Sequence, residues 1–242
     1  MQYKNTKNFS LSRRNLFLGG GLLTLSFSGN DPLTSRQKAI ILGNVLGDGH
    51  LQIAKNEKSA RLRFTHSMKQ TEYVQWQYEN LTWLCEKVKQ PYETTTKSGY
   101  SECIAYTSYQ NELLRYHKYF YKPTGLSKPK FVKVVPENLS EYLTDPLSLM
   151  VWYLDDGTLR KDGGAVRIAT QSFSLEENWI LQDCLNKNFN IKSVLEQWPK
   201  DQYNLTIPSR GGHSKNFLGL FSSTVKKEIP SMRYKVENLP SI

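Results

Sequence analysis

The sequence has few of the residues that build disulfide frameworks or zinc sites. Only three of its 242 residues are cysteine and four are histidine. They form no Cys-x-x-Cys or mixed Cys/His spacing of the kind that binds a metal. Three widely separated thiols also argue against a disulfide-stabilised secreted domain. We therefore interpret Cys85, Cys103 and Cys184 as buried, inert thiols of a protein in a reducing compartment.

Long apolar runs are also missing. The most apolar stretch near the N-terminus, residues 15–28, is too short to span a membrane, and we expect no membrane partner. It follows Arg13 and Arg14, so this region resembles a twin-arginine export signal. Because the chain shows no use of disulfides, we interpret residues 1–33 instead as an N-terminal extension, which we expect to be flexible.

Acidic residues are outnumbered. The chain has 32 Lys and Arg against 22 Asp and Glu, giving a formal net charge of +10. This excess favours a polyanionic partner, most often nucleic acid. Apolar residues make up 38% and aromatics 12%, which is typical of a globular protein rather than a disordered one. The length allows two domains of about 100 residues, each with its own core.

Two segments dominate what is present. Residues 41–49 read ILGNVLGDG and residues 149–157 read LMVWYLDDG, so each is an apolar helical run that ends in Asp-Gly. If the two helices pack side by side, the carboxylates of Asp48 and Asp156 meet at one point. Paired carboxylates suit a hard divalent cation such as Mg²⁺. The alternative interpretation is two ordinary helix ends with turn residues.

The chain also repeats itself. Residues 34–142 and 143–242 share the element order αββαββα, which predicts two similar lobes related by a pseudo-two-fold axis. In each half, Ser, Thr or Asp residues precede the predicted helices, as capping residues do. The predicted starts are Thr34, Ser67, Thr144 or Asp145 (before Pro146), and Ser172.

The predicted strands alternate polar and apolar residues. In residues 61–65 and 166–171 this pattern places Arg, Thr and Gln on one face of a sheet and apolar residues on the other. Aligning the two halves by Ser67 and Ser172 pairs Arg167 with Leu62 rather than with an arginine, so either a bulge intervenes or this alignment is off by one residue. The polar face is either a nucleic-acid contact surface or an ordinary solvated face. Its candidate DNA-binding residues are Arg61, Arg63, Arg160, Arg167 and Gln171.

The two Asp-Gly segments resemble the paired motifs of the LAGLIDADG homing endonucleases, in the monomeric, intron-encoded branch. Residues 135–139, 170–173 and 232–235 resemble that branch too. The resemblance covers roughly residues 36–240. It implies an α+β fold of two pseudo-symmetric αββαββα lobes, which form a DNA-binding β-saddle with the two motif helices packed at the lobe interface.

The resemblance also implies roles for individual residues. The acid at the eighth motif position binds metal in the family, which assigns Asp48 and Asp156 to catalysis and to Mg²⁺, with Mn²⁺ as a possible substitute. Lys133 and Lys235 become the basic residues near the scissile phosphates. Their alternative role is to anchor phosphates or to occupy the surface.

The second motif departs from the family pattern. Gly43 and Gly47 allow close helix packing in the first motif, whereas Val151 and Asp155 stand at the matching positions of the second. We therefore expect a less symmetric helix interface. Asp155 is expected to cap or pack locally, while Asp156 binds the metal.

The function implied by this resemblance is metal-dependent cleavage of both strands of a long, asymmetric DNA target, which promotes intron homing. The expected partner is double-stranded DNA, and the expected state is a monomer. An RNA maturase that assists its own intron, with intron RNA as partner, is the alternative, and a DNA-binding regulator that has lost the acids is a third. The expected location is intracellular, in a chloroplast or mitochondrion.

Overall fold

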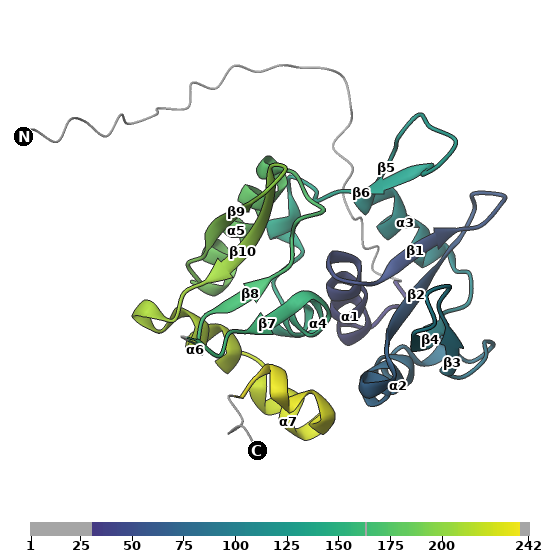
Figure 1. Cartoon of the computed structure of the whole chain (residues 1–242). Helices are drawn as coiled ribbons and strands as arrows, with labels where there is room; N and C mark the ends of the chain where they lie inside the picture. The colour runs from purple at the N-terminus through teal and green to yellow at the C-terminus, as the bar shows by residue number, and fades with distance from the viewer. Residues whose placement is uncertain (1–30, 163, 238–242) are drawn as a thin grey trace, which may run out of the picture.

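The computed structural model describes residues 31–162 and 164–237 (Figure 1). The expected extension over residues 1–33 therefore lies almost wholly outside the described residues. Within them the fold is α+β, with two antiparallel four-stranded sheets in separate lobes, and this confirms the predicted fold class. No described helix is long and apolar enough to cross a membrane.

The first lobe begins with helix α1 and has the strand order β1-β2-β4-β3. A short hairpin, β5–β6, follows its last helix. Its elements are α1 (Ser35–Leu46), β1 (His50–Ile53), β2 (Ala60–Ser67), α2 (Thr71–Asn80), β3 (Tyr92–Thr95), β4 (Ser101–Tyr106), α3 (Asn111–Phe120), β5 (Tyr121–Pro123) and β6 (Phe131–Lys133).

The second lobe repeats this plan, with the strand order β7-β8-β10-β9. Strand for strand it matches the first sheet, but the lobe closes with short helices instead of a hairpin. Its elements are α4 (Pro146–Asp156), β7 (Gly157–Leu159), β8 (Val166–Ile168), α5 (Leu175–Phe189), β9 (Val194–Trp198), β10 (Gln202–Ile207), α6 (His213–Gly219), α7 (Ser222–Glu228) and the 3₁₀ helix η5 (Pro230–Lys235).

The two motif helices start as predicted. Thr34 caps α1 in a capping box with Gln37, since each side chain accepts a hydrogen bond from the other residue's backbone N–H. Asp145, not Thr144, caps α4 by accepting from the Leu147 N–H at 2.9 Å, and Pro146 takes the first helical position.

The starts of the middle helices differ from the prediction. Ser174, rather than Ser172, caps α5, because it has Glu177 three residues on to complete a capping box. Ser67 leads into a 3₁₀ turn, and α2 begins only at Thr71. Ser67 is thus the last residue of β2 and Ser172 lies in the turn ahead of α5, so neither serine caps the α-helix predicted to follow it.

Helices α1 and α4 pack against each other where the lobes meet (Figure 1). A Cβ atom at Gly43 would lie 2.6 Å from the carbonyl oxygen of Ser148 and 2.6 Å from the Val151 Cβ. At Gly47 it would lie 2.5 Å from Asp155 Oδ2. Only glycine allows backbones to approach this closely. Every residue of α4 from 149 to 154 is fully buried, which explains why that motif is apolar all round.

The sheet pairing resolves the register problem of the two halves. His50 pairs with Arg63 in the first sheet, and Thr158 pairs with Arg167 in the second, so Arg167 is the counterpart of Arg63. The alignment by the two serines, which pairs Arg167 with Leu62, is therefore off by one residue. Strand β8 ends at Ile168 whereas β2 continues to Ser67, and the turn after β8 contains the extra residue.

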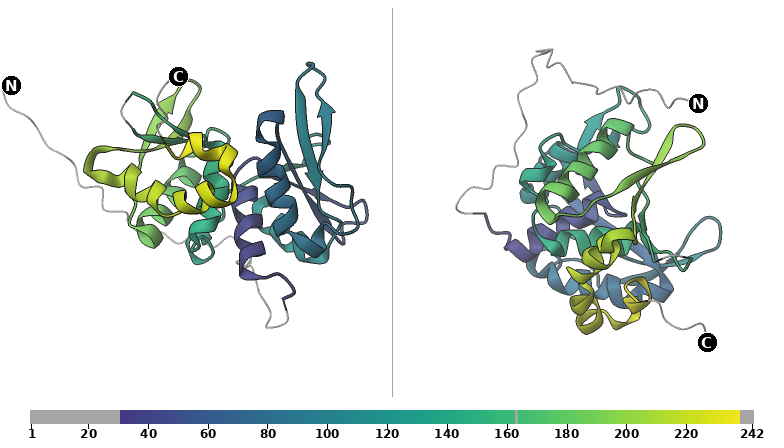
Figure 2. Two further views of the ribbon diagram at one scale, coloured as in Figure 1. Left: turned by 90° about the horizontal axis from the view of Figure 1, so that it is seen from below. Right: turned by 90° about the vertical axis from the view of Figure 1, so that its left-hand side faces the viewer.

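Helix α7 and the 3₁₀ helix η5 of the second lobe dock on the first lobe, as the left view of Figure 2 shows. Glu228 of α7 accepts hydrogen bonds from Trp76 Nε1 at 2.8 Å and from the Arg36 guanidinium at 2.5 Å. The Ser231 N–H of η5 donates to Glu72 of α2 at 2.7 Å. Helix α2 of the first lobe thus supports η5, the segment that ends at Lys235.

Candidate active site at the lobe interface

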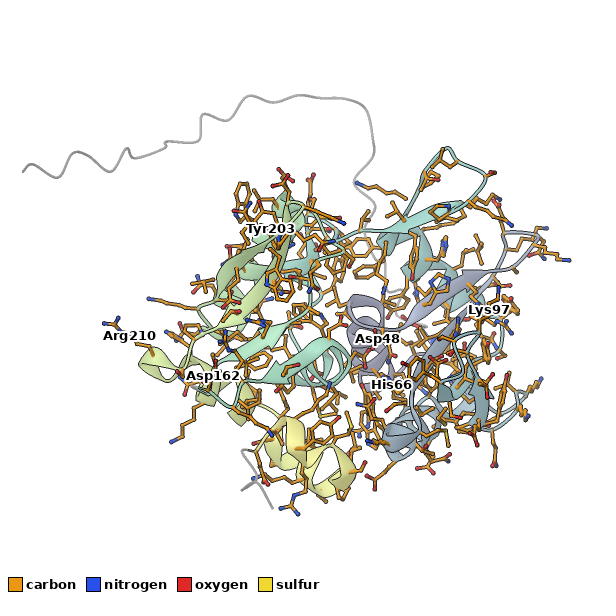
Figure 3. All side chains as sticks on the ribbon, in the orientation of Figure 1. Asp48, His66, Lys97, Asp162, Tyr203 and Arg210 are labelled. Atoms are coloured by element: carbon orange, nitrogen blue, oxygen red, sulfur yellow. The ribbon has the colours of Figure 1, made fainter. Side chains whose placement is uncertain are left out.

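The acid-bearing ends of α1 and α4 lie next to each other. The backbone N–H of Asp48 donates to Asp155 Oδ2 at 3.1 Å, so the two motif turns are in direct contact. Figure 3 places Asp48 near the centre of the molecule, where the lobes meet. Asp48 reaches solvent and Asp156 is half-buried. One acid from each lobe therefore arrives at a shared point.

The carboxylates repel one another. The surrounding protein raises the pKa of Asp48, and the charge of Asp155 raises it further. Burial raises the pKa of Asp156 to about 8, with added repulsion from Asp48 and Asp155. Like charges in a poorly solvated site favour proton uptake or the binding of a cation. The site is thus short of positive charge despite two nearby lysines.

Lys133 and Lys235 each hold a motif turn in place. Lys133 Nζ donates to the carbonyl oxygens of Gly47 at 2.7 Å and Gly49 at 3.0 Å. Lys235 Nζ donates to the carbonyl oxygen of Leu154 at 2.5 Å and lies 3.4 Å from that of Asp155. The carbonyls of Gly47, Leu154 and Asp155 lie at the C-termini of α1 and α4, where cations are favourable.

Burial also lowers the pKa of both lysines, while the acids act in the opposite direction. The two lysines belong to different kinds of secondary structure. Lys133 ends strand β6, whereas Lys235 ends the 3₁₀ helix η5. Their positions beside the motif carbonyls are therefore alike, although the segments that carry them are not.

The donor set fits a hard divalent cation. Among the described residues, no hydrogen bond is made to the side-chain oxygens of Asp48 or Asp156, and both carboxylates remain able to coordinate. The described residues contain no group of three or more His, Cys, Asp or Glu side chains that could hold a metal ion. Mg²⁺ retains waters and takes phosphate oxygens, so two carboxylates are a sufficient protein contribution.

Asp155 does not pack locally as expected. Its side chain is fully buried and crosses to the first lobe, where Tyr73 donates its hydroxyl to Oδ1 at 2.8 Å. His66 Nε2 lies 3.4 Å from the same oxygen. Sequence reasoning missed Tyr73 and His66, because one reads as a residue of an amphipathic helix and the other as the core-facing side of a strand.

The first sheet presents arginines on its open face. In β2 the buried residues alternate with Arg61, Arg63 and Thr65, which are half-buried. Arg61 donates to Gln52 at 2.8 Å, and its guanidinium lies 4.3 Å from the ring centroid of Tyr106. Stacking and hydrogen bonding hold this guanidinium at the sheet surface.

In the second lobe the candidate arginines are paired with acids, and of the two only Arg167 is on a strand, β8, since Arg160 lies just beyond the end of β7. Arg167 contacts Glu196 at 2.8 Å, and Arg160 contacts Glu196 at 3.6 Å and Asp162 at 2.7 Å. Gln171 lies in the turn beyond β8, so it is not on a strand. The predicted contact residues thus form one set per lobe, with the second set engaged in exposed or half-exposed ion pairs.

Two lobes with matching sheets, and a pair of acids where their motif helices meet, define a class of protein. The model of the LAGLIDADG DNA endonuclease family matches residues 38–214, and this chain belongs to that family.

Two named relatives and one solved structure are similar to this chain over most of its length. The DNA endonuclease I-ChuI of Chlamydomonas applanata is 29% identical over 217 residues, which cover 85% of this chain and 96% of that protein. The cytochrome b mRNA maturase bI2 of Saccharomyces cerevisiae is 28% identical over 215 residues, covering 86% of this chain but only 48% of the maturase. A solved structure of the homing endonuclease I-WcaI bound to its DNA recognition sequence shares the fold, with a TM-score of 0.67 at 24% identity over 87% of this chain and 88% of that one.

Proposed function

We propose that this protein is a site-specific DNA endonuclease that makes a metal-dependent double-strand break in a long, asymmetric target and so promotes intron homing. The observation that carries the proposal is the meeting of Asp48 and Asp156 at the ends of α1 and α4, between two sheets that each present arginines. Membership of the endonuclease family and the likeness to I-ChuI support it.

In this proposal Asp48 and Asp156 hold Mg²⁺, and Mn²⁺ can replace it. The bound cation supplies Lewis-acid stabilisation of the phosphate and a more acidic attacking water. Each lobe contributes one carboxylate, which suits one cut per strand. Lys133 and Lys235 keep the motif turns in place and set positive charge where negative charge develops on the phosphate.

The open faces of the two sheets read the DNA. The major groove admits a β-ribbon and offers a distinct donor and acceptor pattern for each base pair. Arg61 and Arg63 act from the first lobe, and Arg160 and Arg167 from the second, with Gln171 at its edge. Because the two lobes carry different side chains on these faces, the target is asymmetric. Binding should weaken steeply with salt, as counterion release requires.

One experiment tests this activity. Purified protein is incubated with Mg²⁺ and an intron-lacking copy of the host gene, and the cut ends are mapped. One break in each strand at a single position, lost in EDTA, is expected. Absence of cleavage with both Mg²⁺ and Mn²⁺ would count against an endonuclease.

A second candidate function is RNA maturation of the host intron. Its specific support is the 28% identity to the yeast cytochrome b mRNA maturase bI2, of which this chain spans about half. A splicing assay with Asp48→Asn and Asp156→Asn separates the two functions. Maturase activity should survive both substitutions, whereas DNA cleavage should not.

We also infer that the protein acts as a monomer in a chloroplast or mitochondrion. Both lobes needed for a complete site are present in one chain, which supports the monomer. The relatives named as intron-encoded endonuclease and cytochrome b mRNA maturase support the organelle. Analytical ultracentrifugation of the free protein and of its DNA complex tests the first point.

A further inference from the structure

The second motif carries one more acid than the first, and its side chain is buried. Asp155 is surrounded by partners from the first lobe. Its Oδ1 accepts the Tyr73 hydroxyl at 2.8 Å and lies 3.4 Å from His66 Nε2, while Oδ2 accepts the Asp48 N–H at 3.1 Å. A buried carboxylate must be paired or hydrogen-bonded, and this one is held from both sides.

Asp155 also connects the groups of the proposed active site. Its side chain holds the backbone of Asp48, and its own backbone leads directly into Asp156. Its carbonyl oxygen lies 3.4 Å from Lys235 Nζ. A shift of this single residue would therefore displace both candidate metal ligands and one lysine.

The first motif has no equivalent of this acid. Gly47 occupies the matching position, and a Cβ atom there would lie 2.5 Å from Asp155 Oδ2. The interface has room for one side chain at this level, and it belongs to the second lobe. Only the second lobe, through Asp155, thus supplies a side chain that connects the turns of Asp48 and Asp156.

We propose that Tyr73 and Asp155, with His66 beside them, form a positioning unit across the lobe interface that sets Asp48 relative to Asp156. This inference rests on the proposed endonuclease function. Hydrogen bonds to a carboxylate are stronger than neutral ones and give it a fixed orientation. Misplacement of a reacting group by about 1 Å can cost roughly 100-fold in rate.

Tyr73→Phe tests the unit by removing the hydroxyl alone. The matched control is Tyr78→Phe on the same helix, which removes a hydroxyl that donates to the carbonyl oxygen of Cys85 at 3.2 Å, away from the site. The single-turnover cleavage rate is measured with saturating protein and Mg²⁺, and DNA affinity is measured in EDTA. For Tyr73→Phe we expect a rate about tenfold lower at unchanged DNA affinity, as for one lost hydrogen bond to a charged group. Tyr78→Phe should cleave at the wild-type rate.

A pair of substitutions at Asp155 separates positioning from bulk stability. In Asp155→Asn the amide oxygen can accept from the Asp48 N–H, and the amide NH₂ can donate to the Tyr73 hydroxyl. Asp155→Ala can do neither. We expect Asp155→Ala to lose roughly 100-fold in rate and Asp155→Asn to recover most of that loss.

A measurement that does not depend on cleavage reports on the contact between the Asp48 N–H and Asp155. The Asp48 amide resonance in a ¹⁵N-labelled protein should move, and its hydrogen exchange should accelerate, in Tyr73→Phe and Asp155→Ala but not in Tyr78→Phe. The positioning role would be overturned if Tyr73→Phe and Asp155→Ala cleaved at the wild-type rate, or if the Asp48 amide resonance and its exchange stayed unchanged in them. Equal losses of cleavage rate in Tyr73→Phe and Tyr78→Phe would overturn it as well. A wild-type protein that cuts no DNA with either cation would overturn the proposed endonuclease itself, and the positioning role with it.

Discussion

Gly47 and Asp155 occupy matching positions of the two motif helices and face each other, so closely that a Cβ on the glycine would fall 2.5 Å from the aspartate Oδ2. One position has no side chain because its counterpart has a buried one. This complementarity makes the helix interface asymmetric where the repeat is otherwise regular. It also makes the interface sensitive to very small changes in volume.

Gly47→Ala should therefore destabilise the protein. The added methyl must displace a buried carboxylate that is held by three contacts, and overpacking of this kind costs about 1–3 kcal/mol. Urea unfolding measures the change. Gly219→Ala is the control, because a Cβ there has nothing within 4 Å. Equal stability of Gly47→Ala and the wild-type protein would contradict the packing described here.

Asp156→Asn should stabilise the metal-free protein at alkaline pH. The folded state raises the pKa of Asp156 to about 8 from an ordinary value of 3.8, so the folded protein binds more protons than the unfolded chain between those values. The free energy of unfolding then falls as pH rises through this window. The full shift corresponds to about 6 kcal/mol, but Asp156 is half-buried and solvent screening reduces the effect. Removing the charge should therefore recover at least about 2 kcal/mol at pH 8.5 in EDTA, measured by urea unfolding. The gain should vanish only well below pH 3.8, where the wild-type carboxyl is protonated in both the folded and the unfolded state.

The same carboxyl should make cation binding depend on pH. A divalent ion must displace the proton from Asp156, so apparent affinity for Mg²⁺ should increase with pH and level off above about 8. Isothermal titration calorimetry in two buffers of different ionisation enthalpy should detect proton release at pH 7. Proton release that persists in Asp156→Asn would assign the titrating group elsewhere.

Cleavage should require both acids although DNA binding does not. Asp48→Asn and Asp156→Asn each remove a charged ligand from the site while keeping its shape, so we expect a loss of at least about 100-fold in cleavage rate. DNA affinity in EDTA should stay within about threefold of wild type, since the removed charges repel phosphate. Gel-based cleavage and fluorescence anisotropy measure the two quantities. Efficient cutting by either variant under Mg²⁺ would reject the assignment of the acids.

Glu196→Gln should tighten binding to DNA of any sequence. Glu196 contacts Arg167 at 2.8 Å and Arg160 at 3.6 Å, and neutralising it leaves both cations available to phosphates. An increase of about threefold to tenfold at low salt is expected, with a steeper dependence on salt concentration. Glu93→Gln is a charge-matched control. Glu93 is exposed on β3 and pairs with the buried Cys103, so its side chain is on the core side of the first sheet and not on the open face that carries the arginines. The same gain in both variants would indicate only a general effect of net charge.

The sequence predicted the features that depend on local pattern and on repetition. Capping by Thr34 and Asp145, strand alternation in β2 and the two-lobe plan all follow from residue type and period. It failed at one local point, because Ser172 was predicted to start α5 although Ser174 and Glu177 have the spacing of a capping box. Its other failures depend on distant partners. The register of Arg167 could be fixed only by the strand opposite it.

The roles of Tyr73 and His66 at the lobe interface also could not be predicted from the sequence. The acids at positions 48 and 156 could be singled out from their motifs, but nothing in the local sequence around Tyr73 or His66 indicates a partner 82 or 89 residues further along the chain. That contact exists because two helices and a strand from different lobes converge on one carboxylate. The placement of Lys235 likewise depends on a first-lobe helix, through Glu72 and the N–H of Ser231.

The unequal facing residues of the motif helices have a consequence for protein engineering. A homodimer of the first lobe would bring two glycines together and leave each Tyr73 hydroxyl without the carboxylate that accepts from it here. A homodimer of the second would force two aspartates into the space that now holds one. The two halves fit each other at this position because one supplies the space and the other the side chain, so a symmetric dimer built from the second lobe would need a smaller residue in place of Asp155.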